Sequence, residues 1–206
     1  MTETDRIRRL YDDRAPTYDR SIGAVERIML GPFRREYGAL LKGETIEVGV
    51  GSGLNIPFYS TDVTRAVGVD LSGAMLRLAR QRSTELNIPF AFTQADAEAL
   101  PFPDATFDTV AISLALCTIP DPRKALLELS RICRTDGRIV LLEHVRSTAR
   151  PLAAVQHLLS PLNERAIGCH LDRDTFSLAR SLGFSIDQIH TRLFAAVGLA
   201  VARPPA

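Results

Sequence analysis

The sequence predicts an α/β protein built on a doubly wound, mostly parallel sheet with helices on both faces. From residue 45 onward, short apolar runs alternate with segments of helical periodicity, which is the pattern of successive βαβ units. Three glycines at alternate positions follow the first apolar run, as expected where a strand of a parallel sheet ends beside a ligand pocket. At 206 residues the chain is long enough for one such domain with a full core, and short for two.

The alternation gives the expected elements in order. Strands are expected in five apolar runs: Thr45–Gly49, Ala66–Asp70, Phe90–Gln94, Thr109–Ser113 and Arg138–Glu143. Helices are expected in three amphipathic segments: Ser72–Leu86, Pro122–Arg134 and Asp172–Leu182. Ser72 has the side chain of an N-cap, and Gly183 suits the end of the last helix. The segment Phe184–Ala202 has room for two more strands.

We expect a single domain over residues 1–206. The first forty residues have helical periodicity, and Pro151–Ile167 reads as a helix inserted after the fifth strand. Its leucines Leu158, Leu159 and Leu162 suit either a lid over an acceptor or plain core. The expected parts are an N-terminal helical cap (1–43), a ligand-binding core (44–146), a helical insertion (147–170) and a C-terminal helix with strands (171–206).

Composition narrows the class of protein. Charged residues make up 24% and hydrophobic ones 46%, with a net charge of +1, so nothing points to a nucleic-acid partner. No secretory signal is recognisable, and no apolar run reaches the ~18–20 residues of a membrane span. Cys117, Cys133 and Cys169 are odd in number, far apart and without zinc spacing. We therefore expect a cytoplasmic protein without disulfides or metal, and leave its oligomeric state open.

The turn Gly49-x-Gly51-x-Gly53 is informative about the ligand. Glycine tolerates positive φ and lets a ligand approach the backbone. A dinucleotide fingerprint would read Gly-x-Gly-x-x-Gly, but Leu54 stands where its last glycine belongs, and no P-loop lysine follows. The carboxylate of Glu47, beside the turn, would repel a pyrophosphate and suits an ammonium or sulfonium group. The turn therefore disfavours phosphorylated nucleotides.

Asp70, at the end of the second strand, indicates that the expected ligand contains a sugar. A carboxylate at that position accepts hydrogen bonds from the hydroxyls of a ribose in related sheets. A ribose-bearing ligand that is cationic rather than phosphorylated is S-adenosylmethionine (SAM), with S-adenosylhomocysteine as its demethylated product. The alternatives are a purely structural turn, a nicotinamide-dependent oxidoreductase on a related sheet, and a protein that binds SAM without turnover.

The remaining strand ends supply further candidates. Asp96 follows the third strand and suits the exocyclic amine of adenine. His144 ends the fifth strand and is the candidate general base; the alternative is a histidine that holds a loop. Cys117 and Cys169 are expected to be small buried apolar residues. Arg173 is expected to pair with one of the aspartates beside it in sequence, Asp172 or Asp174.

The chain resembles the class I SAM-dependent methyltransferases of type 11, which include the ubiquinone and menaquinone C-methyltransferases. The matching motifs are Tyr11-Asp12-x-x-Ala15-x-x-Tyr18-Asp19, Glu47-x-Gly-x-Gly-x-Gly53, Gly68-Val69-Asp70-x-Ser72-x-x-Met75-Leu76, Asp96-Ala97-Glu98-x-Leu100-Pro101-Phe102 and Phe107-Asp108. The resemblance implies a Rossmann-like, seven-stranded sheet with a reversed last strand. It also implies that Asp70 holds the ribose, that Asp96 holds the adenine amine, and that Tyr11 and Tyr18 help to cover the cofactor.

The second half also resembles the methyltransferase-like thiol S-methyltransferases of vertebrates. The matching motifs are Asn55-x-x-Phe58-Tyr59, Leu114-x-Leu116-Cys117, Leu142-Glu143-His144-Val145, Pro161-Leu162 and Gly168-Cys169-x-Leu171-x-Arg173-x-Thr175. Those enzymes carry an N-terminal apolar membrane anchor that has no counterpart in this sequence. The resemblance implies a small thiol as the methyl acceptor.

Together these observations predict a SAM-dependent methyltransferase acting on a small or lipophilic acceptor, first a thiol. The alternative acceptors are a quinone carbon, a phospholipid amine or a natural product. His144 is the expected catalytic residue. The expected cofactor-binding residues are Tyr11, Tyr18, Glu47, Gly49, Gly51, Gly53, Asn55, Asp70, Leu71, Met75, Asp96, Ala97, Ser113 and Leu114.

Overall fold

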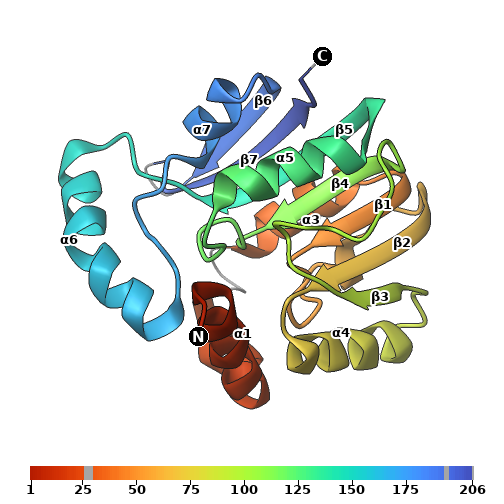
Figure 1. The fold of residues 1–206 in the computed structure, drawn as a ribbon, viewed down its shortest axis with the longest axis horizontal. Helices are drawn as coiled ribbons and strands as arrows, with labels where there is room; N and C mark the ends of the chain where they lie inside the picture. Colours follow the sequence, from red (N-terminus) through yellow and green to blue (C-terminus); the bar gives the residue numbers. More distant parts are fainter. Residues whose placement is uncertain (26–29, 193–194, 206) are drawn as a thin grey trace.

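A seven-stranded mixed sheet forms the centre of the computed structural model, which describes residues 1–25, 30–192 and 195–205 (Figure 1). The strands are β1 (Gly43–Val48), β2 (Val63–Asp70), β3 (Ala91–Gln94), β4 (Phe107–Ser113), β5 (Cys133–His144), β6 (Ser185–Arg192) and β7 (Val197–Arg203). Their order is β3-β2-β1-β4-β5-β7-β6, and β7 is antiparallel to both of its neighbours. The expected fold, with its reversed last strand, is confirmed.

The helices are α1 (Glu3–Arg14), α2 (Tyr18–Val25), α3 (Gly31–Leu40), α4 (Gly73–Glu85), α5 (Pro122–Ile132), α6 (Arg150–Ile167) and α7 (Thr175–Ser181). Short 3₁₀ turns cover Ala15–Thr17 and Ile56–Phe58. Ser72 caps α4 as expected, because its hydroxyl accepts from the Met75 N–H at 3.1 Å. The last helix is shorter than expected, since Asp174 caps it by accepting from the Ser177 N–H.

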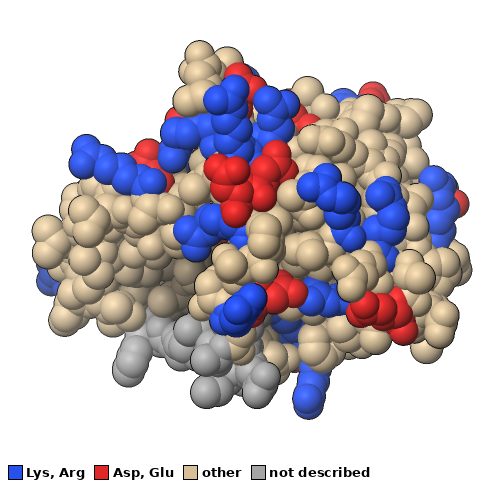
Figure 2. Space-filling model, turned by 90° about the horizontal axis from the view of Figure 1, so that it is seen from below, with Lys and Arg blue, Asp and Glu red and all other residues tan. Residues whose placement is uncertain are grey.

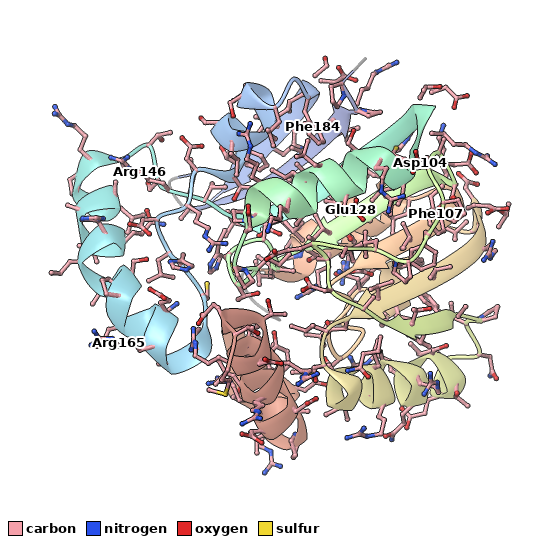
Figure 3. The ribbon with its side chains drawn as sticks, viewed as in Figure 1. Asp104, Phe107, Glu128, Arg146, Arg165 and Phe184 are labelled. Atoms are coloured by element: carbon pink, nitrogen blue, oxygen red, sulfur yellow. The ribbon has the colours of Figure 1, made fainter. Side chains whose placement is uncertain are left out.

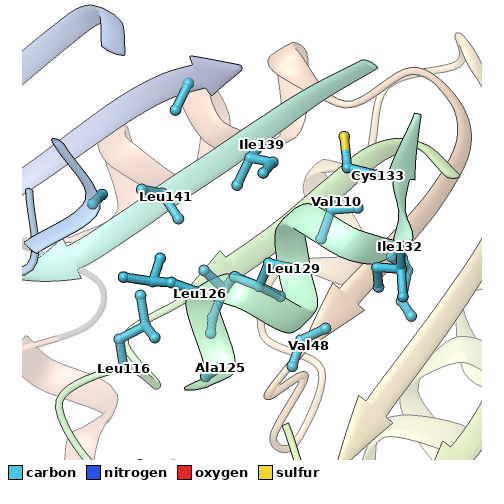
Figure 4. Close-up of a cluster of buried hydrophobic side chains, with 14 of the residues drawn as sticks. Val48, Val110, Leu116, Ala125, Leu126, Leu129, Ile132, Cys133, Ile139 and Leu141 are labelled. Atoms are coloured by element: carbon cyan, nitrogen blue, oxygen red, sulfur yellow. The ribbon is translucent and has the colours of Figure 1, made fainter. Parts of the chain in front are cut away.

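Two hydrophobic layers sandwich the sheet, as its alternating side chains require. Val110 and Ile112 of β4 pack in the cluster that includes Leu126 and Leu129 of α5 (Figure 4). Ala111, between them in sequence, belongs to the opposite cluster, which contains two aromatic side chains of α3. Figure 1 shows α5 and α7 on one face of the sheet and α3 on the other. Burial on both faces explains why the strand runs are apolar throughout.

The helix α6 stands to one side of this sandwich (Figure 1). Leu158 is 78% exposed and Leu162 69%, and neither lines the cavity described below. The expectation that the leucines of this helix form core or a lid is therefore wrong. None of the helices in the described ranges combines the length and the hydropathy of a membrane-crossing segment.

Candidate cofactor site

A cavity opens at the carboxyl ends of the parallel strands. Ligands of doubly wound sheets bind at this edge. Of the fourteen residues that the sequence marks as cofactor-binding, thirteen line the cavity; the exception is Gly53. A Cβ on Gly53 would lie 2.6 Å from Ile56 Cδ1 and 3.2 Å from Ala79 Cα, so this glycine serves the packing of α4 behind the turn. The strand ends thus converge as expected for a doubly wound sheet.

A buried hydrogen-bond chain surrounds Glu47 at the end of β1. Asn55 Nδ2 donates to Glu47 Oε1 at 2.5 Å, and the Tyr59 hydroxyl donates to Oε2 at 2.6 Å. Arg34 Nη1 in turn donates to Asn55 Oδ1 at 2.5 Å. Burial raises the pKa of Glu47, while these donors favour its ionised form. Glu47 therefore provides a fixed acceptor at the floor of the cavity.

Asp70 receives two backbone donors at the end of β2. The Gly51 N–H donates to Oδ2 at 2.8 Å and the Ser72 N–H to Oδ1 at 2.8 Å. Burial nevertheless raises its pKa to about 6. Gly49 and Gly51 have φ of 72° and 55°, so the turn exposes backbone to the cavity in a conformation that other residues resist. Turn and carboxylate form one rigid unit, which is suited to a ligand's sugar.

The helix α1 is fastened over this unit through Asp12. Its Oδ1 accepts from the Ser72 hydroxyl at 2.6 Å and from the Ala74 N–H at 3.1 Å. Tyr11, on the same helix, lines the cavity with Tyr18, and their ring centroids lie 6.2 Å apart. The N-terminal segment therefore covers the cavity, as the resemblance implied.

The segment that starts α2 is fastened by a second cluster. The Ser52 hydroxyl, in the glycine turn, donates to Asp19 Oδ1 at 2.5 Å. Arg82 of α4 donates to the other Asp19 oxygen and to the Ser52 carbonyl. These contacts join α2, the turn and α4 beside Tyr18. The N-terminal segment that covers the cavity is therefore fixed near Tyr11 by Asp12 and near Tyr18 by Asp19.

The loop after β4 forms the remaining wall. Leu114 has a φ of 53°, which strains an L-residue, and its N–H donates to the Leu142 carbonyl at 2.7 Å. Glu143 Oε1 accepts from the N–H groups of Ala115 and Leu116 at 3.1 and 3.0 Å. Arg173 Nη1 donates to the carbonyls of Leu116 and Ile119. Glu143 and Arg173 therefore fix the backbone of this loop through its N–H and carbonyl groups.

Arg173 and His144 do not take the positions that the sequence suggested. Arg173 forms no ion pair with Asp172 or Asp174 in the described part of the chain, because its guanidinium is used by the loop carbonyls. His144 does not line the cavity. Successive strand residues face opposite ways, and Glu143 takes the side that reaches the loop. The role of His144 as general base therefore remains a prediction.

His144 lies instead in a small sulfur cluster. Its Nδ1 is 3.9 Å from the Sγ of Cys169, and both Cys117 and Cys169 are buried, as expected. The His170 N–H donates to the Cys117 carbonyl at 2.9 Å, which joins the segment after α6 to the loop after β4. A hydrogen bond from Cys117, followed by the influence of His144, lowers the pKa of Cys169.

Sequence reasoning missed several residues of the site. Asp12 and Glu143 lay inside quoted motifs without a role, and their contacts join segments 60 and 27 residues apart. Arg8 and Arg34 line the cavity, and Arg34 is buried, so the expectation that these paired arginines lie on solvated helix faces is wrong for Arg34. A signal did exist for Glu143: an acidic residue at the end of a buried strand.

The donors and acceptors of the cavity fit SAM. Ser113 Oγ lines it, is buried and has no hydrogen-bond partner among the described residues, so it is available to a ligand. Asp70 and Asp96 stand at adjacent strand ends, as acceptors for a ribose and an adenine amine require. Glu47 gives the glycine turn a negative floor, which suits the ammonium of a methionine moiety. No group of three or more metal-ligating side chains is arranged for an ion within the described ranges.

Comparison with known proteins agrees with this geometry. Residues 46–141 match the family described as a methyltransferase domain. A phosphatidylethanolamine N-methyltransferase of Cereibacter sphaeroides is 37% identical over 174 residues, which span 82% of this chain and 83% of that protein. A demethylmenaquinone methyltransferase of Renibacterium salmoninarum is 30% identical over 155 residues, 73% of this chain and 64% of its own length.

The chain belongs to the SAM-dependent methyltransferases. A crystal structure from Thermotoga maritima, described as a SAM-dependent methyltransferase and possible histamine N-methyltransferase, superposes with a TM-score of 0.72. It covers 96% of this chain and 99% of its own, but at 21% identity it shows the fold alone. The relatives do not support the thiol acceptor that the sequence favoured.

Proposed function

We propose that this protein transfers the methyl group of SAM to the amine of a phospholipid headgroup. The observation that carries the proposal is the 37% identity with a phosphatidylethanolamine N-methyltransferase across 82% of the chain. That alignment extends well beyond residues 46–141, so it includes segments outside the matched methyltransferase region. The quinone alternative has weaker support, since the Renibacterium relative is 30% identical over a smaller share of the chain.

Arg8 suits the phosphate of a phospholipid headgroup. Glu47, Asp70 and Asp96 are the acceptors assigned above to SAM, so they do not serve the acceptor. Arg8 lines the same cavity with a side chain 42% exposed, and it pairs with Asp5 at 3.0 Å. A phospholipid amine lies two carbons from its phosphate, so a partly exposed arginine that lines the cavity matches a phosphate whose amine reaches the methyl group.

The residues of the chain act mainly by position and by excluding water. When bound, SAM supplies an electrophilic methyl group on a sulfonium. Leu114, Ile119 and Pro120 present an apolar wall to the cavity, and Tyr11 covers it from α1. A dry, fixed site of this kind favours an in-line displacement by a positioned lone pair. The attacking group is the neutral amine, so an ammonium that enters must first release its proton to water, and His144, which does not line the cavity, is not placed to accept it.

The test offers the purified protein SAM with a labelled methyl group and one acceptor at a time. The acceptors are short-chain phosphatidylethanolamine below its micelle concentration, a demethylmenaquinone analogue and a small alkyl thiol. We expect the monomethylated lipid to form at least about tenfold faster than either other product, a difference of about 1.4 kcal/mol in barrier. Turnover of the quinone or the thiol with no methylated lipid would overturn the proposal.

A further inference from the structure

The helix α6 exposes its apolar side chains to solvent. Val155 is 49% exposed, Leu158 78%, Leu159 46% and Leu162 69%. Of the seven large apolar side chains that are exposed in the described ranges, these are four. Their spacing of three, four and seven residues places them on one face of the helix. The face formed by these four residues is called the outer face of α6 below.

The side of α6 that faces the protein carries polar residues beside the buried Ala153. Gln156 Nε2 donates to the Val145 carbonyl at 3.0 Å, and Gln156 Oε1 accepts from the Ser147 N–H at 2.8 Å. Ser160 donates to Asp172 Oδ1 at 2.6 Å. Asn163 Nδ2 donates to the Cys169 carbonyl at 2.6 Å. A helix of a protein in water normally buries its leucines and exposes its amides, so α6 has the reverse polarity.

Positive charge flanks the outer face, and negative charge is turned away from it. Arg146 and Arg165 lie near opposite ends of α6 (Figure 3), and both are exposed, as is Arg150 at its first turn. The acidic residue of the helix, Glu164, lies 3.8 Å from the ring of His170. On the side of the molecule that α6 occupies in Figure 1, Figure 2 shows a broad uncharged area whose upper margin carries basic side chains with acidic atoms beside them. Leucines bordered by arginines are the composition of a helix that lies in a membrane interface.

The C-terminal end of α6 lies close to the cavity. Tyr11 lines the cavity, and its hydroxyl donates to the carbonyl of Ile167, at the end of α6, over 3.4 Å. Arg14 donates to the neighbouring Ala166 carbonyl at 3.3 Å. Gly168 packs so closely on Ile7 that a Cβ there would lie 2.6 Å from its Cδ1, and Ile7 also lines the cavity. A surface that met the outer face would therefore lie along a helix whose end contacts α1, the cover of the cavity.

We infer that the outer face of α6 docks on an anionic lipid bilayer and lies in its interface. The leucines enter the boundary between headgroups and acyl chains, and the flanking arginines meet anionic headgroups. A second copy of this chain is a poorer occupant. Pairing two α6 helices about a two-fold axis would bring Arg150 and Arg165 of both copies together, with no exposed acidic residue of α6 to compensate. The inference deepens the proposed function, because it brings the cavity to the surface that holds the acceptor.

The test is sedimentation of the full chain with vesicles of phosphatidylcholine, with and without phosphatidylglycerol. We expect binding to the anionic vesicles that falls as salt is added. Leu158→Gln with Leu162→Gln should reduce the partition coefficient by about tenfold or more, because two leucine side chains no longer enter the bilayer. The matched control is Leu127→Gln on α5, a leucine 46% exposed outside the outer face, which should bind as the unchanged protein does.

Each outcome decides the inference. SAM titration of the double variant checks that it folds, since neither leucine lines the cavity. Equal vesicle binding by the folded double variant would overturn the inference. It would also be overturned if the unchanged protein bound no vesicles but formed a dimer, and the double substitution abolished that dimer. The proposed function is tested by a different measurement, the turnover of short-chain phosphatidylethanolamine without vesicles. If that turnover is absent while the protein still binds anionic vesicles, the proposed function is wrong and the inference about the outer face stands.

Discussion

At the scale of single residues, the raised pKa of Asp70 should make the affinity for SAM depend on pH. Its pKa is raised to about 6 by burial, against 3.8 for a free aspartate. Below that value the folded protein holds a proton on this carboxyl group, and the group can no longer accept from both ribose hydroxyls. We expect the affinity for SAM to rise between about pH 5 and pH 7, because the carboxylate forms in that window. Calorimetric titration across this range measures the effect.

The variant Asp70→Asn should bind SAM about 10- to 100-fold more weakly near neutral pH and lose this pH dependence. The loss corresponds to about 1.4–2.7 kcal/mol, typical of hydrogen bonds to a charged group. Asp136→Asn is the matched control, because Asp136 is exposed and does not line the cavity. Unchanged affinity in the Asp70 variant would exclude the ribose role.

Glu143 makes a prediction about stability rather than binding. It is fully buried, its Oε2 has no hydrogen-bond partner among the described residues, and burial raises its pKa to about 7. Between about pH 4.5 and pH 7 the folded protein holds a proton that the unfolded chain has lost, so the contribution of Glu143 to stability falls as pH rises through that window. Glu143→Gln removes this loss and keeps an acceptor for Ala115 and Leu116.

We therefore expect Glu143→Gln to be about 1–3 kcal/mol more stable than the unchanged protein near pH 8, and about equal to it near pH 5. Thermal unfolding at several pH values measures the difference. A variant destabilised equally at every pH would mean that the native carboxylate is compensated by a partner, and that the amide is the poorer group.

The residues that the sequence predicted and those it missed differ in the range of their contacts. The glycine turn and Asp70 stand at the ends of strands recognisable from local pattern, and parallel pairing brings such ends together without further information. Asp12 reaches Ser72 across 60 residues, and nothing local marks that contact. His144 was misplaced relative to the cavity because one position along a strand reverses the direction of a side chain.

At the scale of elements, α1 depends on one carboxylate for its place over the cavity. Asp12 accepts from Ser72 and Ala74 at the N-terminus of α4, where partial positive charge also favours it. Asp12→Ala should loosen α1 without unfolding the sheet. We expect trypsin to cleave the arginines of α1 at least about threefold faster, because cleavage follows the population of the opened form.

Asp13 provides the matched control for this helix. It is the exposed neighbour of Asp12 and does not line the cavity, so Asp13→Ala should leave cleavage unchanged. SAM should slow cleavage of the unchanged protein, since Tyr11 lines the cavity from the same helix. Identical cleavage of both variants would show that α1 is held by its other contacts.

The helix α6 shows what periodicity leaves undetermined. A stripe of leucines at helical spacing predicts a helix, and Arg150–Ile167 is one. The same stripe does not specify whether the apolar face meets the core or the surroundings. That choice is made by Gln156, Ser160 and Asn163, whose hydrogen bonds attach the polar side to the protein. The information lay in the polar residues between the leucines.

At the scale of the whole molecule, the sandwich and the cavity meet at the strand ends. Val48 and Val69 belong both to the cluster around α5 and to the cavity lining, whereas the α5 side chains of that cluster do not line the cavity. The reversed β7 extends the sheet beyond β5 and brings β6 to its edge. Substitutions on α5 should therefore change global stability without changing cofactor affinity.

Two adjacent leucines of α5 test this separation. Leu126 is fully buried against the sheet (Figure 4), whereas Leu127 is 46% exposed. Leu126→Ala leaves a cavity in a close-packed core and should lower the free energy of unfolding by about 2–5 kcal/mol. Leu127→Ala should change it by less than about 0.5 kcal/mol. Urea unfolding measures both, and SAM titration below the transition should give the same affinity for both variants. If Leu126→Ala weakened SAM binding as much as it weakened the fold, the α5 layer would be part of the site.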